Sequence, residues 1–177
     1  MNDLIQRMQS RYPITQVHFQ RENLAFCTVT KEQAVTLITH LRDRENFRHL
    51  VFLTAVDYIE QDIFQLTYLL HNYENHSDLG LRVEIDRAKP SMESIHHLWE
   101  QAATYQRELK EMFGINFPGS PRVDESFILE GWDNIPPMRK DFDTRKYSEE
   151  TYFPRPGRKT EDPETYMKRQ LYPEREV

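Results

Sequence analysis

Apolar and polar residues alternate along several short stretches in the first half of the chain, which is the period-two pattern of β-strands. The clearest case sets Phe64, Leu66 and Tyr68 against Gln65 and Thr67. The predicted strands lie at residues 15–20, 24–29, 50–56, 63–70 and 79–85. The run 50–56 is nearly all apolar, so we expect a strand covered on both faces. Short links between neighbouring runs favour antiparallel pairing.

Apolar residues spaced three or four apart predict helices at three places. The first covers residues 2–11, and the second opens at Thr30, where Thr30 and Gln33 form a T-x-x-Q capping box. Its predicted buried stripe is Ala34, Leu37, Ile38 and Leu41. A third, long helix is predicted from Pro90 to Phe113, and Gly114 occupies the place of a left-handed C-cap. The expected fold class is α+β, with a mixed, mainly antiparallel sheet packed against helices.

The pattern changes after residue 117. Eight of the ten prolines lie beyond it, and acidic and basic side chains are intermixed from Arg139 onward. Such a composition cannot bury enough apolar area to fold alone. A plain disordered tail is one interpretation, but widely spaced aromatic residues favour a segment that orders along a partner. They are Trp132, Phe142, Tyr147, Tyr152, Phe153, Tyr166 and Tyr172. We therefore expect an α+β domain at 1–117 and an extended arm at 118–177.

Charge and composition exclude several classes of function. The net charge is −6 without a basic block, which argues against nucleic-acid binding. Cys27 is the single cysteine, so this chain alone cannot supply a cysteine-ligated zinc or iron–sulfur site. No apolar stretch approaches the roughly 20 residues of a membrane-spanning helix, and the first residues show no signal-peptide pattern. A soluble chain is expected.

Candidate catalytic chemistry is sparse. His71, Glu74, His76 and Asp78 could ligate a metal, but such side chains in a hairpin loop are usually solvated. No glycine-rich phosphate loop or nucleophile motif occurs among the five glycines. The charged run at 107–111 offers either acid–base groups or an ion-paired docking face. A hydrolase that uses Glu108, Glu111 and His97 stays open as an alternative, whereas we expect no catalytic, cofactor or metal site in this chain.

Two motifs resemble a known family. Residues 98–121, "LWEQAATYQRELKEMFGINFPGSP", resemble the signature of the C subunit of respiratory complex I, the NADH:quinone oxidoreductase. Residues 128–142, "ILEGWDNIPPMRKDF", are similar to its downstream Pro-Leu-Arg-Lys-Asp-Phe run, and "LTAVDY" and "FQLTYLL" resemble its central strands. The signature has glutamate, aspartate and histidine where this chain has Gln106, Glu111 and Ser120. The family also serves membrane-bound energy-converting hydrogenases and complexes linked to ferredoxin or F420.

The resemblance implies a cofactor-free structural subunit of the peripheral arm. In an ion-translocating complex it would dock on and stabilise the large quinone-site subunit, which resembles a hydrogenase large subunit, beside neighbouring iron–sulfur subunits. NADH, FMN, iron–sulfur clusters and quinone would belong to other subunits. The assembly would be a hetero-oligomer, with this chain peripheral on the cytoplasmic side of the inner membrane and without a span of its own. The alternative host is a hydrogenase-type or ferredoxin- or F420-linked complex.

The expected docking residues are charged or aromatic and lie at a strand end, on the helix and in the arm. They are Asp57, Tyr58, Arg107, Glu108, Glu111, Trp132, Arg139, Lys140, Asp141 and Phe142.

Overall fold

The computed structural model describes residues 1–151, which form two compact units. The first covers Met1–Phe142 and the second begins at Asp143. The arm was expected to begin at residue 118, whereas the first unit continues to Phe142. The expected aromatic contacts of Tyr152, Phe153, Tyr166 and Tyr172 lie outside the described residues.

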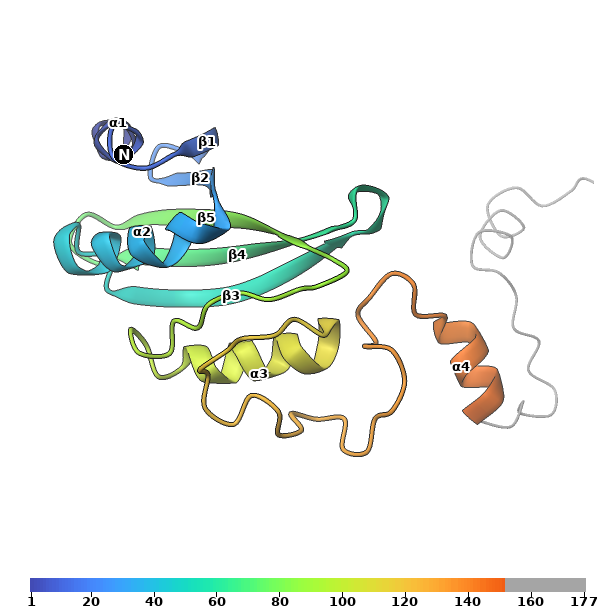
Figure 1. Cartoon of the computed structure of the whole chain (residues 1–177). Coiled ribbons are helices and arrows are strands. Elements are labelled where there is room, and N and C mark those ends of the chain that lie inside the picture. The colour runs from blue at the N-terminus through green and yellow to red at the C-terminus, as the bar shows by residue number, and fades with distance from the viewer. Residues whose placement is uncertain (152–177) are drawn as a thin grey trace, which may run out of the picture. The chain divides into compact units, whose positions relative to one another are not determined.

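A five-stranded mixed sheet forms the centre of the first unit (Figure 1). Its strands are β1 (Ile14–Arg21), β2 (Leu24–Val29), β3 (His49–Tyr58), β4 (Ile63–Asn72) and β5 (Ser77–Asp86). Their order across the sheet is β1-β2-β5-β4-β3. Three pairs are antiparallel, as the short links predict, and β2 pairs with β5 in parallel. The predicted α+β class, with a mixed and mainly antiparallel sheet, is confirmed.

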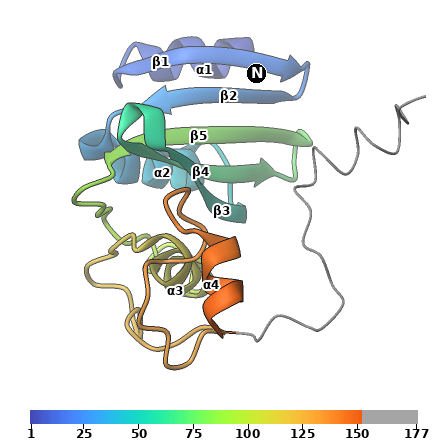
Figure 2. The same cartoon turned by 90° about the vertical axis from the view of Figure 1, so that its right-hand side faces the viewer.

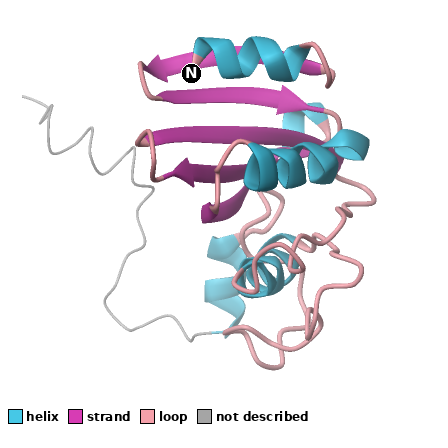
Figure 3. Cartoon of the chain, turned by 90° about the vertical axis from the view of Figure 1, so that its left-hand side faces the viewer, coloured by secondary structure: helices cyan, strands magenta, loops and turns pink. Residues whose placement is uncertain are grey.

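The first two helices gather on one side of this sheet. Helices α1 (Asn2–Gln9) and α2 (Lys31–Arg44) lie against one face (Figure 3), and the opposite face is turned to the viewer in Figure 2. The predicted stripe of α2 is fully buried. Alternate residues of β4, including Phe64, Leu66 and Tyr68, are also fully buried, so the period-two prediction for this strand is correct. These side chains form the core.

Helix α3 (Ala102–Phe113) is attached to the edge strand β3. Trp99 Nε1 donates to the carbonyl oxygen of Arg48 at 2.8 Å, and the Tyr105 hydroxyl donates to that of Val51 at 3.1 Å. Gln101 donates in the same way to Leu50. These hydrogen bonds occupy backbone carbonyl groups at the start of an edge strand. Left unpaired, such groups could pair with a strand of another chain.

Three local predictions from the sequence need correction. Strand β3 is an edge strand with Thr54 and Val56 exposed, so it is not covered on both faces. The long helix begins at Ala102 rather than at Pro90. Residues 91–95 are not helical because Met92 N–H donates to Asn116 and Asn116 N–H donates to Pro90, and turns follow before Ala102. Thr30 is the N-cap of α2, but its side chain makes no capping hydrogen bond.

Gly114 ends α3 as predicted. Its φ is 77°, its N–H donates to Lys110, and the N–H of Ile115 reaches back to Leu109. A side chain at this position would meet a left-handed backbone, and its Cβ would lie 3.2 Å from Pro136 Cγ.

We expect Gly114→Val to lower the free energy of unfolding by about 1–2 kcal/mol, because a β-branched residue disfavours positive φ. Gly114→Asn should cost less, since asparagine tolerates the left-handed region. Urea denaturation of both variants measures the difference. Equal stability of Gly114→Val and the wild type would contradict the assigned cap.

Candidate partner-docking site

A buried carboxylate lies at the end of the edge strand. Asp57 is 3% exposed and accepts two hydrogen bonds from Arg87, from Nε at 2.8 Å and from Nη2 at 3.1 Å. Arg87 directly follows β5, and its guanidinium forms the paired geometry that suits a carboxylate. Because a buried charge is costly unless it is paired, Arg87 is what allows Asp57 to stay ionised inside the fold.

The segment that ends the first unit joins this pair. The backbone N–H of Lys140 donates to Asp57 Oδ2 at 2.8 Å, and Arg87 Nη2 donates to Asp141 Oδ1 at 2.7 Å. Arg139 Nε donates to the same Asp141 oxygen at 3.2 Å. We call Asp57, Arg87, Arg139 and Asp141 the ion cluster. It fastens the chain near residue 140 to the ends of β3 and β5.

The pKa values of the two carboxyl groups reflect this pairing. Burial by itself raises the pKa of Asp57, but the hydrogen bonds from Arg87 and Lys140 and the charges of Arg87 and Arg139 outweigh it. The net pKa lies below the usual 3.8. The pKa of Asp141 is lowered in the same way, with Arg87 and Arg139 outweighing burial. The pKa of Arg87 is raised, chiefly by its hydrogen bond to Asp57. All three groups are charged at neutral pH.

Glu111 holds a second part of the same segment. Its carboxylate accepts the backbone N–H groups of Phe127, Ile128 and Leu129, at 2.6, 2.9 and 3.1 Å. It is therefore occupied by main-chain donors rather than aimed at a substrate. Nearby, Arg107 lies over the Phe127 ring at 5.5 Å and 3.8 Å from a carboxylate oxygen of Glu125. Glu111 and Arg107 of α3 thus hold the segment 127–129 against the helix.

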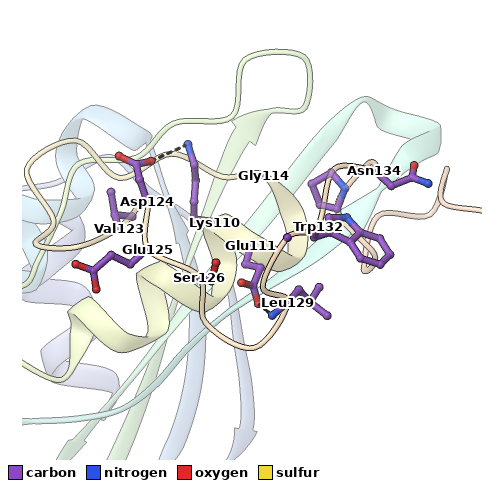
Figure 4. Close-up of a pocket in the computed structure, with 12 residues that line it drawn as sticks. Lys110, Glu111, Gly114, Val123, Asp124, Glu125, Ser126, Leu129, Trp132 and Asn134 are labelled. Carbon is purple, nitrogen blue, oxygen red and sulfur yellow. Dashed lines mark hydrogen bonds and ion pairs between the residues drawn. The ribbon is translucent and has the colours of Figure 1, made fainter.

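A pocket of about 390 Å³ lies between the end of α3 and this segment (Figure 4). Leu129, Trp132 and Pro136 give it an apolar wall. The Trp132 indole is fixed by a hydrogen bond from Nε1 to Ile135 O at 3.0 Å and meets the Phe142 ring edge-on at 5.5 Å. Lys110 and Asp124 form an ion pair across its rim at 3.7 Å.

The structure brings several of the predicted residues together and leaves others separate. Asp57, Lys140 and Asp141 meet in and beside the ion cluster, and Trp132 meets Phe142. Tyr58 and Glu108 are half-buried, and Glu108 makes no hydrogen bond or ion pair with any residue from 1 to 151. Arg87 was not predicted, because its role depends on the strand order, in which one strand, β4, separates Asp57 at the end of β3 from Arg87 at the end of β5. The amide groups at 127–129 carried no sequence signal at all.

Two side chains of the candidate metal loop pair with each other. His71 pairs with Asp78 across β4 and β5 at 2.8 Å. No group of three or more metal-ligating side chains occurs within residues 1–151. In the same range no helix is long and apolar enough to cross a membrane. Gln106, where the family signature has glutamate, is fully buried and accepts a hydrogen bond from Ser94 Oγ at 2.8 Å. The neutral amide avoids placing an ionised carboxylate there.

Comparisons with known proteins agree with one another. Residues 27–148 match the family described as "Respiratory-chain NADH dehydrogenase, 30 Kd subunit". The C subunit of the NADH-quinone oxidoreductase of Moorella thermoacetica is 32% identical, over 80% of this chain and 95% of that protein. The C subunit of the F(420)H(2) dehydrogenase of Methanosarcina mazei is 28% identical, over 65% and 73%. The second C/D subunit of the NADH-quinone oxidoreductase of Aquifex aeolicus is 27% identical, over 78% of this chain and 23% of that longer protein.

Solved structures share the fold. A chain of the membrane-bound sulfane sulfur reductase, an archaeal respiratory membrane complex, superposes with a TM-score of 0.80 at 24% identity. That match covers 92% of this chain and 96% of the other. The trypsin-resistant fragment of Nqo5 gives a TM-score of 0.58 at 21% identity, covering 68% and 96%. At these identities the likeness establishes the fold alone.

We expect Asp57→Asn to lower the free energy of unfolding by about 3 kcal/mol, because it removes the buried counter-charge of Arg87 and leaves only the more exposed Asp141. Hydrogen exchange of the amides at 139–142 should also become faster. Glu125→Gln removes an exposed partner of Arg107 and should change stability by less than about 0.5 kcal/mol. A similar loss in both variants would show that the ion cluster does not hold the segment.

The stabilisation from Asp57 should depend on pH in one direction. Because its folded pKa is below 3.8, the contribution is complete above the unfolded pKa and is lost as pH falls through the folded value. Urea denaturation of the wild type and Asp57→Asn should therefore differ fully above about pH 5, and the difference should shrink as pH falls below about 4 and through the folded pKa. A difference that stays constant or grows on acidification would contradict the assigned pairing.

Proposed function

The chain belongs to the family of the 30 kDa subunit of respiratory-chain NADH dehydrogenase, and from this premise we propose that it is a cofactor-free structural subunit of an ion-translocating NADH:quinone oxidoreductase. In that role it docks on the large quinone-site subunit and stabilises it, beside neighbouring iron–sulfur subunits. NADH, FMN, the clusters and quinone are bound elsewhere in the assembly. The chain lies peripherally, on the cytoplasmic side of the inner membrane.

Exposed apolar side chains in residues 127–142, which we call the arm segment, carry this proposal. Six large apolar side chains are exposed in the described chain, and three of them, Ile128, Ile135 and Met138, lie close together in sequence. Their exposed fractions are 68%, 40% and 58%. In the sequence, Ile128 directly precedes Leu129 of the pocket wall, and Ile135 and Met138 follow Trp132 of the same wall. Apolar side chains gathered on a surface and rimmed by polar residues mark sites of protein contact.

The segment is also held in place before any partner arrives. Glu111 fixes its start through three backbone N–H groups, and the ion cluster fixes its end. Ordering a free chain on binding costs roughly 1–2 kcal/mol per backbone residue. A segment already fixed at both ends avoids much of that cost, and a rigid Trp132 is the kind of side chain that anchors interfaces. The arm beyond Phe142 would extend the contact.

A relative supports the choice of partner. In Aquifex aeolicus the similar region is part of one longer polypeptide whose name joins the letters C and D. Covalent fusion keeps two functions at one place, which fits a chain that is built to sit against the D subunit. We take the D subunit to be the large quinone-site subunit, as the family resemblance implies.

The second candidate host is an F420- or hydrogenase-type complex. The similarity to a subunit of the F(420)H(2) dehydrogenase and to a chain of the sulfane sulfur reductase favours it as the alternative. Mass spectrometry of the co-purified complex separates the two hosts. Subunits that bind NADH and FMN indicate the first, and either a subunit that binds F420 or a large subunit with nickel–iron ligand cysteines indicates the second.

The docking prediction can be tested by placing charge in the exposed apolar surface. We expect the double variant Ile128→Asp and Met138→Asp to lose most co-purification with the large subunit, because a buried unpaired charge at an interface is costly. Tyr73→Asp is the matched control, since Tyr73 is 63% exposed in the β4–β5 turn. It should assemble at normal yield.

Two measurements make the result decisive. Thermal unfolding of the isolated variants should match the wild type, because the substituted side chains are exposed. Full assembly of the double variant, at the yield of the Tyr73→Asp control, would show that this segment does not contact the large subunit.

A further inference from the structure

A second pocket lies at the other end of α3. It has a volume of about 520 Å³ and is lined by Arg42, Asp43, Arg48 and Trp99. Arg42 belongs to the last turn of α2, Arg48 directly precedes β3, and Trp99 lies in the turn before α3. Three elements therefore bring two arginines and one tryptophan to a single place, although the chain as a whole has a net charge of −6.

The positive charge of this pocket is only loosely compensated. Arg42 Nη1 lies 2.6 Å from the carboxylate of its neighbour Asp43, and the two side chains are 37% and 47% exposed. An exposed pair of this kind stabilises little and exchanges readily for another carboxylate. The Arg48 side chain is exposed and makes no hydrogen bond or ion pair within residues 1–151. Two guanidinium groups and one carboxylate leave one positive charge uncompensated.

The aromatic wall is fixed. Trp99 Nε1 donates to the carbonyl oxygen of Arg48, which holds the indole against the start of β3. The Arg42 guanidinium lies 5.7 Å from the centre of the indole ring, so it is held by a cation–π contact and by Asp43. Tryptophan and arginine are among the residue types most enriched in the side chains that dominate protein interfaces. Here they line the same hollow and are already oriented.

We infer that this pocket binds an acidic segment of a neighbouring subunit, separately from the apolar surface at 128–138. An aspartate or glutamate of the partner would be bound by Arg42 and Arg48, and an adjacent apolar side chain would lie against the Trp99 indole. Arginine favours such contacts because its planar group binds carboxylates with two hydrogen bonds. The inference rests on the proposed function, since it requires that the chain be assembled with other subunits.

Zero-length cross-linking in the assembled complex tests the inference. Arg48→Lys keeps the charge and supplies an amine, which a carbodiimide joins to a carboxylate in direct contact. Peptide mapping should find the introduced lysine linked to an aspartate or glutamate of another subunit. Arg44→Lys is the matched control, because Arg44 is exposed in the same turn of α2 but does not line the pocket. It should give no such link.

Charge reversal provides an independent measurement. Arg42→Glu combined with Arg48→Glu should weaken association with the partner subunits by about ten-fold or more, because rim and pocket charges then repel the acidic segment. The effect should be larger at about 50 mM than at about 500 mM salt. Arg44→Glu should stay within about two-fold of the wild type, and thermal unfolding of each isolated chain shows whether the fold is intact.

The possible outcomes separate this inference from docking at 128–138. Links only to Asp43 or to a second copy of this chain, or no link at all, overturn the acidic-segment inference. If Lys140 still links to another subunit in the same digest, docking through the arm segment stands while the second contact is rejected. If the wild-type chain does not co-purify with any subunit, both the proposed function and this inference are wrong.

Discussion

A single buried carboxylate, Asp57, ties the end of the first unit to its sheet. Taking an ionised carboxylate out of water is costly unless each oxygen finds a donor. Arg87 donates to both oxygens, and the Lys140 amide adds a third hydrogen bond. The Lys140 contact joins residues far apart in sequence, so the position of the arm depends on β3 and β5 being correctly paired through β4. The sheet must form before the segment can be held.

The same logic explains how a segment with little apolar burial keeps a defined course. Residues 118–142 contribute no strand or helix, so their backbone groups must find partners elsewhere. Glu111 supplies one acceptor for three consecutive amides, which is the arrangement of a backbone anion site filled by the chain's own carboxylate. Because polar contacts hold the backbone, the apolar side chains of Ile128 and Met138 are free to face outward. In this segment the backbone groups therefore hold the chain in place, and the apolar side chains are available for contact with a partner.

Local patterns could be predicted from the sequence, whereas their spatial partners could not. The alternation in β4 and β5 and the stripe of α2 identify the core, because burial on one face imposes period 2 or 3.6. An apolar run such as 50–56 does not reveal an edge strand, since α3 and the neighbouring segments can cover much of its surface. The start of the third helix, predicted at Pro90, was wrong because the backbone groups of Pro90 and Met92 pair with Asn116, a contact that no local spacing encodes. Arg87 was missed for the same reason, and so was α4 (Thr144–Thr151), whose short charged sequence has no buried stripe.

The two pockets at the two ends of α3 differ in chemistry, one being apolar and the other basic, and this difference sets a direction. Near the C-terminal end of the helix, the charges of Lys110 and Asp124 pair with each other at the rim of an apolar wall. Near its N-terminal end, Arg42 and Arg48 add positive charge around Trp99. Twelve residues of helix separate these ends by roughly 18 Å, which exceeds the Debye length of about 8 Å at physiological salt. Each pocket therefore acts on its own part of a partner. A surface with an apolar pocket at one fixed point and a basic pocket at another accepts a complementary surface in one orientation, since reversal would place an apolar group of the partner at the arginines and an acidic group at the apolar wall.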